Sequence, residues 1–179
     1  MEELDINKLK LLLLAFFIFT LSSFIGAAAT YTVATDGTGN YATIQAAVNS
    51  ASSGDIIIVY PGTYTENIVI TRANLELRSA SGNPEDTIIA SNTTGKDVIY
   101  IGARANSRIK GFTISGATGI SSSGISLGTC KDCTIEDNKL LNNNMGISLK
   151  SSGNIVVRNN TATVGTGTGI YITQSYSTT

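Results

Sequence analysis

The sequence predicts an all-β fold, a parallel β-helix or solenoid, with one short α-helix capping its N-terminal end. The main observation is a four-residue phrase that begins with Gly-Ile and recurs at residues 124–127, 146–149 and 169–172, with spacings of 22 and 23 residues. A fixed period of this size is typical of repeat architectures. Each copy alternates apolar and polar residues, as a strand does, and is bounded by turn residues. One repeat has room for two or three short strands and none for a helix, which favours a coil of a β-helix.

The repeats keep their register outside this phrase, which predicts that equivalent side chains stack. Ile109, Ile135 and Val157 align, and so do Asn138 and Asn160. Adjacent strands lie roughly 4.8 Å apart, so aligned residues on consecutive coils form columns. A single coil cannot bury its apolar face, and stability comes from contacts between neighbouring coils. We expect about five coils that share one core.

The N-terminal segment is predicted to lie outside this domain. Lys8 and Lys10 precede an apolar run over residues 11–19, and residues 27–29 are three alanines suited to cleavage. This is the layout of a secretory signal peptide, which we assign to residues 1–29. The run is shorter than the ~20 residues that span a bilayer, so an uncleaved membrane anchor is the secondary alternative. The β-helix domain then covers residues 30–179, and we expect it to be truncated at its C-terminal end.

Composition excludes several classes of function. Without the predicted signal peptide the chain has ten basic and ten acidic side chains. It therefore lacks the basic stripe that nucleic acid requires, and we expect it to meet a membrane only through the signal segment. The sequence contains no histidine, which excludes a Ser-His-Asp triad and removes the commonest metal ligand. We expect no cofactor, with Ca²⁺ as a candidate ion.

The remaining elements follow in order from local patterns. Residues 31–33 form a first short strand, and residues 43–51 give the one clear helix, with Thr43 as its N-cap and one apolar face. Repeat folds need caps, so this helix is expected to cover the N-terminal end of the stack. Gly54 ends the helix. Further strands are expected at residues 56–60, 68–70, 75–77 and 88–89, and regular repeats from residue 97.

The opening of the domain carries a family resemblance. Residues 41–48 (Tyr-Ala-Thr-Ile-Gln-Ala-Ala-Val), Gly54-Asp55, residues 61–64 (Pro-Gly-Thr-Tyr) and Glu66 are similar to the N-terminal segment of pectin methylesterases, members of the pectin-lyase-like superfamily. The later phrases resemble the parallel β-helix repeats of NosD-like (periplasmic copper-binding-protein-like) proteins and of prokaryotic cell-surface proteins. Together the resemblances cover about residues 31–175. They imply a right-handed, single-stranded β-helix in which any catalytic residues lie on later coils.

Two columns of outward side chains are candidates for carbohydrate binding. The first contains Tyr100, Ser126, Ser148 and Tyr171. Its two aromatic rings, beside small hydroxylic residues, would form a shelf on which sugar rings stack. The competing interpretation is that these residues have no binding role and occupy an exposed strand face because of their high β-propensity. The column holds no carboxylate, whereas glycoside hydrolysis needs a pair of them.

The second column contains Lys110, Glu136 and Arg158 on consecutive coils. As a functional site, Lys110 and Arg158 would neutralise an acidic sugar such as a uronate, and one of them would serve as the base of a lyase. As a structural feature, the column is a cross-strand ion ladder worth roughly 0.2–1 kcal/mol per pair. We favour the structural interpretation.

A candidate metal site consists of Asp132, Glu136 and Asp137, three carboxylates within six residues. Ca²⁺ takes about six to eight oxygen ligands, and the superfamily resemblance implies calcium bound by acidic residues. These three lie on a turn and a strand, where alternate side chains diverge. This divergence weighs against a formed site.

Two residue pairs receive structural interpretations. Asn138 and Asn160 occupy equivalent turn positions, where Asn tolerates the left-handed backbone and hydrogen-bonds its own turn. Cys130 and Cys133 form a Cys-x-x-Cys motif without the second pair that a zinc site requires. A buried free thiol or a short-range disulfide is therefore favoured over a redox site.

Two tripeptides, Asn92-Thr-Thr94 and Asn159-Asn-Thr161, match the N-glycosylation pattern. Use of either is compatible with an exported protein, although the pattern is common by chance.

Motifs for specific enzymes are missing. Arg108-Ile-Lys110 matches a tripeptide of polygalacturonases, but the His and paired-Asp motifs of that family are absent, as are the later motifs of pectin methylesterases. The predicted function is an exported module, secreted or at the cell surface with the periplasm as a further location, that contacts polysaccharide or cell-wall glycan without catalysis. The alternative is an N-terminal fragment of a polysaccharide lyase or hydrolase, and a third possibility is a structural spacer.

Overall fold

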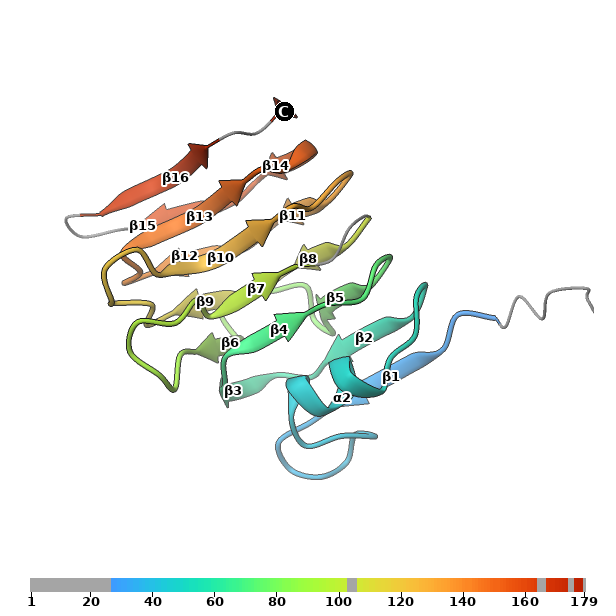
Figure 1. The fold of residues 1–179 in the computed structure, drawn as a ribbon. Coiled ribbons are helices and arrows are strands. Elements are labelled where there is room, and N and C mark those ends of the chain that lie inside the picture. Colours follow the sequence, from blue (N-terminus) through green and yellow to red (C-terminus); the bar gives the residue numbers. More distant parts are fainter. Residues whose placement is uncertain (1–26, 103–105, 164–166, 174–175, 179) are drawn as a thin grey trace, which may run out of the picture.

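The computed structural model describes residues 27–102, 106–163, 167–173 and 176–178. These residues form a parallel β-solenoid of about six turns with a single short helix (Figure 1), which confirms the predicted fold class. Of the predicted signal peptide, residues 1–26 lie outside the described residues. Within the described part of the chain, no helix has the length and apolar character needed to cross a membrane.

The strands form three parallel sheets, called sheets A, B and C below, and from the second strand onward consecutive strands of the chain pass from one sheet to the next. Sheet A contains, in spatial order, β1 (Thr30–Val33), β2 (Ile56–Val59), β5 (Glu76–Ser79), β8 (Arg108–Lys110), β11 (Thr134–Glu136), β14 (Gly153–Arg158) and β17 (Tyr176–Thr178). Sheet B contains β3 (Gly62–Thr65), β6 (Thr87–Ala90), β9 (Thr113–Ser115), β12 (Lys139–Leu141) and β15 (Thr161–Thr163). Sheet C contains β4 (Ile68–Ile70), β7 (Ile99–Ile101), β10 (Ser123–Gly128), β13 (Met145–Lys150) and β16 (Thr168–Thr173).

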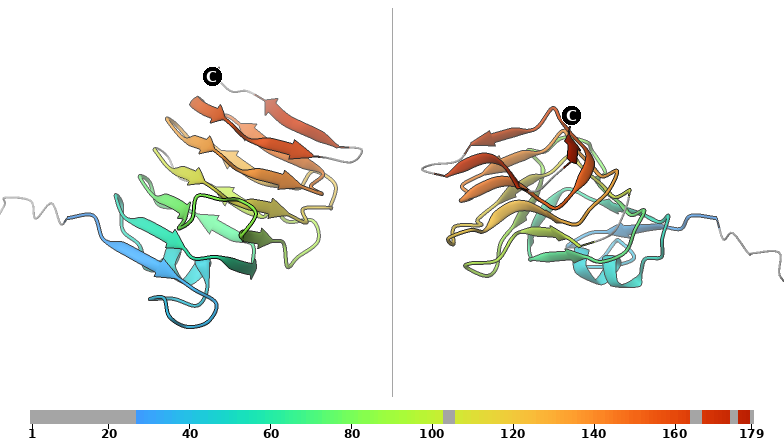
Figure 2. Two further views of the ribbon diagram at one scale, coloured as in Figure 1. Left: turned by 180° about the vertical axis from the view of Figure 1, so that it is seen from behind. Right: turned by 45° about the horizontal axis from the view of Figure 1, so that its top comes forward.

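Strand pairing preserves the register of the sequence repeats. Ile109, Ile135 and Val157 occupy one column of sheet A, and Ile125 pairs with Ile147 on sheet C, as the alignment predicts. Figure 2 shows the strands of successive coils lying parallel, one beyond the other along the stack. The repeat length of 22 to 23 residues therefore determines which side chains share a face.

The core is one continuous cluster that runs the length of the solenoid. Inward residues such as Leu77, Ile114 and Leu127, one from each sheet, are fully buried. Burial of each such side chain contributes about 1.5–3 kcal/mol relative to exposure. On β16 the equivalent positions, Ile170 and Ile172, are 48% and 51% exposed.

The helix α2 (Ile44–Ser50) lies at the N-terminal end of the stack, beside β1 and β2 (Figure 1). Ile44, Ala47 and Val48 bury its apolar face, which confirms the predicted cap within one residue at each end. Thr43 occupies the N-cap position, but its side chain makes no capping hydrogen bond.

Capping comes from the next coil instead. The Glu66 carboxylate accepts hydrogen bonds from the backbone N–H groups of Ile44 and Gln45, both over 2.9 Å. The side chain of Gln45 in turn accepts a hydrogen bond from the backbone N–H of Val69 over 2.7 Å. Two residues of the opening motif, Gln45 and Glu66, thus fasten the helix to the solenoid. Their role in this chain is structural.

Asparagine side chains form hydrogen bonds with backbone groups at one corner of the solenoid, which we call the asparagine corner. Asn138 Oδ1 accepts a hydrogen bond from the backbone N–H of Phe112 over 3.1 Å. Its Nδ2 donates to the Ile109 carbonyl over 3.1 Å and to Asn160 Oδ1 over 3.0 Å. Asn160 repeats the arrangement one coil later by donating to the Ile135 carbonyl over 2.7 Å. The predicted structural role of this pair is confirmed, but its predicted basis is wrong. The left-handed backbone lies at the preceding residues, Asp137 and Asn159, with φ of 55° and 54°, and Asn138 bonds the preceding coil.

The glycine of the repeated phrase is required by close approach at another corner. A Cβ on Gly124 would lie 2.7 Å from Asn143 Nδ2 and 3.0 Å from the carbonyl oxygen of Gly146. Asn143 is itself committed, because it accepts a hydrogen bond from the backbone N–H of Ala117 and donates one to the Ile114 carbonyl, both over 2.9 Å. A larger residue at position 124 would displace this buried amide.

Candidate functional site

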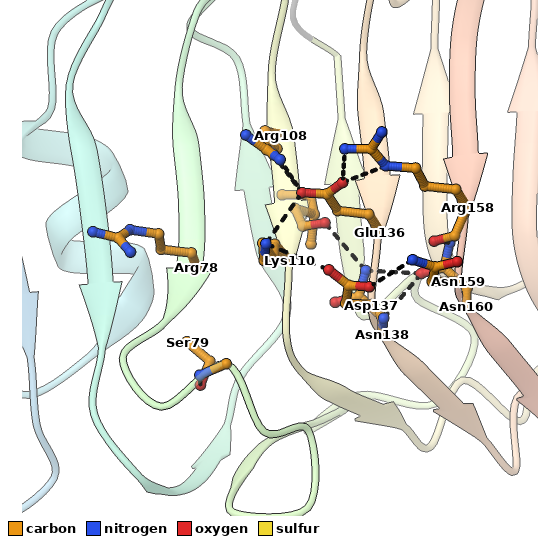
Figure 3. A network of polar contacts seen from close by, with 12 residues as sticks. Arg78, Ser79, Arg108, Lys110, Glu136, Asp137, Asn138, Arg158, Asn159 and Asn160 are labelled. Atoms are coloured by element: carbon orange, nitrogen blue, oxygen red, sulfur yellow. Dashed lines mark hydrogen bonds and ion pairs between the residues drawn. The ribbon is translucent and has the colours of Figure 1, made fainter.

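The first candidate site is the charged ladder on the outer face of sheet A. Lys110, Glu136 and Arg158 are direct neighbours on β8, β11 and β14, as the sequence predicts. Figure 3 shows their side chains pointing toward one another, with Arg108 on the other side of Glu136 from Arg158. We define the charged ladder as these four residues: Arg108, Lys110, Glu136 and Arg158.

Glu136 lies at the centre of the ladder and is only 2% exposed. Arg108 Nε donates to Glu136 Oε1 over 2.7 Å, and Arg158 Nε donates to Oε2 over 2.6 Å. A second guanidinium nitrogen of each arginine contacts the same oxygen. Lys110 Nζ lies 3.5 Å from Oε1. Both carboxylate oxygens are therefore occupied by cations.

The pKa of Glu136 reflects two opposing effects. Burial raises the pKa by penalising the charged carboxylate, but the hydrogen bonds and charges of Arg158 and Arg108 together outweigh it. The pKa of Glu136 is therefore lowered from its ordinary value of 4.5. A carboxylate held in this way stays ionised at neutral pH and is a poor proton donor.

Sequence reasoning missed Arg108 as a member of the ladder. Arg108 pairs directly with Thr134 and reaches Glu136 diagonally. The signal was present, because Arg108 and Lys110 are two residues apart on one strand and must share a face. Diagonal neighbours across a sheet remain within reach of long side chains.

A polar hollow of about 480 Å³ adjoins the ladder. Arg108 and Arg158 contribute to its wall, and their side chains are 38% and 56% exposed. The remaining lining residues are Gly54, Ile56, Asn74, Glu76, Asn106, Ser107, Asp132, Thr134 and Val156. The hollow thus offers guanidinium, amide and carboxylate groups to a polar ligand.

The predicted calcium ligands are engaged with protein partners. Asp132 Oδ1 accepts a hydrogen bond from Asn154 Nδ2 over 2.9 Å, and Asp137 Oδ1 accepts one from Asn159 Nδ2 over 3.2 Å. Glu136 is held by the arginines. Among the described residues, no group of three His, Cys, Asp or Glu side chains is arranged to hold a metal ion. Calcium binding at Asp132, Glu136 and Asp137 stays a prediction, and this geometry weighs against it.

The second candidate site is the tyrosine column on the outer face of sheet C. Tyr100, Ser126, Ser148 and Tyr171 follow one another in register on β7, β10, β13 and β16, as predicted. The two tyrosines are 38% and 43% exposed, whereas the two serines are buried. The exposed surface of these four residues is therefore aromatic and lies at the two ends of the column.

A second hollow, of about 440 Å³, lies beside Tyr171. Its polar lining comes from Ser121, Asn144, Lys150 and Thr168, and its apolar lining includes Ile120 and Met145. An exposed ring next to hydroxyl, amide and ammonium groups presents the apolar face and the hydrogen-bond partners that a sugar requires.

The four predicted sugar-binding residues do not form one site. Tyr100 and Tyr171 lie on sheet C, whereas Lys110 and Arg158 lie on sheet A. The structure brings each pair together on its own face and separates the two pairs. They are therefore two independent candidate surfaces.

Cys130 and Cys133 form a disulfide in the turn between β10 and β11. Both residues are buried, at 1% and 0% exposure. Of the two interpretations that the sequence favours, the short-range disulfide is the one observed.

Solved structures share the fold. An alginate lyase from Paenibacillus superimposes with a TM-score of 0.61 at 18% identity, over 75% of this chain and 44% of the lyase chain. Pectin methylesterase from carrot gives a TM-score of 0.52 at 17% identity, over 88% of this chain and 65% of that chain. At these identities the likeness concerns the fold alone, the pectin-lyase-like parallel β-helix.

Sequence comparison gives a more specific assignment. A cell surface glycoprotein of Methanothermus fervidus is 35% identical over 138 residues, which are 76% of this chain and 21% of that protein. The chain thus spans about a fifth of this relative's length. The family model described as "Periplasmic copper-binding protein (NosD)" matches residues 48–179. Because this match covers well over half of the chain, the protein belongs to the NosD family of parallel β-helix proteins.

Proposed function

We propose that the chain is an exported β-helix module, secreted or at the cell surface, that contacts polysaccharide without cleaving it. Its similarity to a cell surface glycoprotein and its membership of a family described as periplasmic support the location. The Cys130–Cys133 disulfide also supports it, because disulfides persist mainly in oxidising compartments outside the cytosol. Export through a signal peptide at residues 1–29 remains part of this proposal.

The observation that carries the proposal is the pair of exposed tyrosines in one column. Tyr100 and Tyr171 are separated by three strand intervals, or roughly 14 Å along the stack. Ser126 and Ser148 between them are buried, so the two rings supply the exposed surface of the column that a sugar chain could contact. Lys150 and Asn144 beside Tyr171 supply hydrogen-bond donors.

Binding of neutral oligosaccharides tests this surface. A ligand that binds only the folded protein raises its melting temperature. We expect at least one glycan of a neutral panel to do so, and we expect Tyr171→Ala to weaken its binding by about tenfold, equivalent to about 1.4 kcal/mol. Tyr171→Phe keeps the ring and should retain most of the affinity.

Val69→Ala is the matched control, since Val69 is an exposed apolar residue of the same column that offers no aromatic ring. Unchanged affinity in Tyr100→Ala and Tyr171→Ala, measured for a glycan that does bind, would remove the tyrosine column from the proposal.

The charged ladder is the second candidate surface, and it would select acidic glycans. Arg108, Lys110 and Arg158 surround a single buried carboxylate, so positive charge exceeds negative charge within the ladder. Asp137, which lies 3.4 Å from Lys110, offsets part of this excess. We expect oligogalacturonate binding at this face to weaken with added salt and in Lys110→Gln. Salt-independent binding would instead favour the tyrosine column.

The absence of catalysis is also a proposal. A glycoside hydrolase needs a carboxylic acid with a raised pKa, whereas the pKa of Glu136 is lowered. The alternative of a lyase or hydrolase fragment has only structural neighbours in its favour, and these share the fold at 18% identity or less for the two described above. Incubation with alginate and polygalacturonate should yield no new reducing ends and no unsaturated products. Either product would restore the enzyme alternative.

Copper does not fit the residues of this chain. Copper sites use His, Cys thiolate and Met ligands, but the sequence contains no histidine and only two methionines. Both cysteines are paired in the disulfide. We therefore propose no copper role for these residues.

Calcium binding is tested by melting the protein with and without Ca²⁺. We expect no shift of the melting temperature if Asp132 and Asp137 keep their asparagine partners.

A further inference from the structure

The two N-glycosylation tripeptides of the chain lie in different structural settings. Asn92-Thr-Thr94 lies in the turn between β6 and β7, at the corner where sheet B meets sheet C. Asn159-Asn-Thr161 leads from β14 into β15, at the corner where sheet A meets sheet B. The motif alone does not distinguish them, but their hydrogen bonds do.

The first tripeptide projects from the solenoid. Residues 92–96 are all exposed. The acceptor nitrogen, Asn92 Nδ2, has one long contact, 3.5 Å to the Thr65 carbonyl oxygen, a separation at the limit of a hydrogen bond. The turn is anchored through its backbone instead, because Asn92 N–H donates to Asn67 Oδ1 over 3.2 Å. Derivatisation of the side chain would therefore leave the anchor in place.

The second tripeptide is part of the asparagine corner. Asn159 Nδ2 donates to Asp137 Oδ1 over 3.2 Å. Asn160 holds the Ile135 carbonyl, and the backbone N–H of Thr161 donates to the Asn138 carbonyl over 2.9 Å. The Asn159 side chain is itself exposed, but a transferase would have to break its contact with Asp137 and reshape the backbone that Asn160 and Thr161 hold in place.

We propose that Asn92 carries an N-linked glycan and that Asn159 does not, an inference that rests on the proposed location outside the cytosol. The donor is an oligosaccharide attached to a lipid through phosphate. Asn92 Nδ2 bonds to C1 of the first sugar, the bond between C1 and the phosphate oxygen breaks, the lipid phosphate leaves, and the nitrogen loses one proton to a base. No oxidation or reduction is involved.

The position of Asn92 is compatible with ligand binding at the charged ladder. The turn belongs to the corner between sheets B and C, so the attached glycan would leave the charged ladder on sheet A uncovered. N-linked glycans are bulky and solubilising. A glycan here would also shield the exposed turn of residues 92–96 from proteases.

Mass spectrometry of the full chain tests the proposal directly. The protein is produced in cells that export it and attach N-linked glycans, and is then digested with trypsin. Cleavage after Arg78, Lys96 and Arg158 separates the tripeptides, because Asn92 falls in peptide 79–96 and Asn159 in peptide 159–179. We expect the mass of an oligosaccharide on peptide 79–96 and the unmodified mass for peptide 159–179.

Conservative variants provide the controls. Thr94→Ala destroys the pattern without touching Asn92 and should abolish the modification, whereas Thr94→Ser preserves both. Thr161→Ala should change nothing. An unmodified peptide 79–96, or a glycan on peptide 159–179, overturns the inference.

Protease treatment of intact cells separates this failure from failure of the proposed function. Protein that is accessible at the surface but bare at Asn92 refutes the glycan and leaves the location standing. Protein that never leaves the cytosol refutes both.

Discussion

Arg158 Nε donates a hydrogen bond to Glu136 Oε2 over 2.6 Å, from one coil of the solenoid to the next. The Glu136 side chain is 2% exposed, whereas that of Arg158 is 56% exposed. Because water cannot solvate the buried carboxylate, its charged form depends on Arg158 and on Arg108 from the preceding coil. The contact therefore ties three consecutive strands of sheet A together through one carboxylate, and it makes their association sensitive to pH.

Acid should weaken the protein through Glu136. The folded-state pKa of Glu136 lies below the ordinary value of 4.5, so at acidic pH the unfolded chain binds a proton that the folded protein excludes. The stability that this carboxylate contributes is therefore fully present above about pH 4.5 and is lost as pH falls through the folded-state pKa. Melting temperatures measured from about pH 7 down to about pH 2 should fall more steeply for the wild type than for Glu136→Gln.

Glu85→Gln is the matched control, because it removes a carboxylate of the same type whose side chain is 63% exposed. It should follow the wild-type profile. Parallel profiles for the wild type and Glu136→Gln would show that Glu136 is not the group responsible.

The helix cap gives a second prediction, which runs against the local sequence signal. Replacing an N-cap Thr by Ala usually lowers stability by about 0.5–2 kcal/mol. Here Thr43 makes no side-chain capping bond, and Glu66 supplies the acceptors. We expect Thr43→Ala to be near neutral and Glu66→Ala to lower the free energy of unfolding by about 0.5–2 kcal/mol. Urea denaturation of both variants measures this, and the reverse order would contradict the observed cap.

What the sequence could predict follows from what a repeat encodes. A period of about 22 residues, combined with the alternation of inward and outward residues along a strand, determines which side chains form a column. Tyr100 and Tyr171 could therefore be placed in one column, and Lys110 and Arg158 in another. Contacts that leave the column could not be placed. Arg108 reaches Glu136 diagonally, which register alone does not specify.

The helix cap likewise could not be predicted from local sequence preferences. Thr43 satisfies the residue preference for an N-cap, but Glu66 lies one coil further along the chain and brings a charged acceptor to the same N–H groups. A carboxylate at a helix N-terminus also gains from the helix dipole. Only the three-dimensional stacking of coils reveals this competitor. The sequence separates the four candidate sugar-binding residues into two columns, but the sheet topology was needed to show which sheet carries each column.

The asparagine corner gives a third prediction. Asn138→Ala would leave the backbone N–H of Phe112 and the carbonyl of Ile109 without their side-chain partner inside the solenoid. Each buried group left unsatisfied lowers stability by about 1–3 kcal/mol. We expect a loss of that order or greater in chemical denaturation. Asn159→Gly is the control, because Asn159 is exposed, has a positive φ of 54° that glycine adopts freely, and contributes one outer contact.

A loss in Asn138→Ala no larger than in Asn159→Gly would refute the structural role of the corner. Hydrogen exchange adds a local measurement, since the Phe112 amide should lose protection in Asn138→Ala and keep it in Asn159→Gly.

The disulfide between Cys130 and Cys133 gives the last prediction, and it bears on both stability and location. The bridge closes a loop of only a few residues, for which chain entropy gives a stabilisation of about 2 kcal/mol. The double variant Cys130→Ala/Cys133→Ala should lose about that amount, and reductant should lower the melting temperature of the wild type but not of the double variant. Both cysteines are buried, so reduction should require unfolding. Protein unfolded without reductant should expose no reactive thiol, because both sulfur atoms are bonded in the bridge. Two titratable thiols in exported protein would contradict the bridge and remove one support for an oxidising compartment.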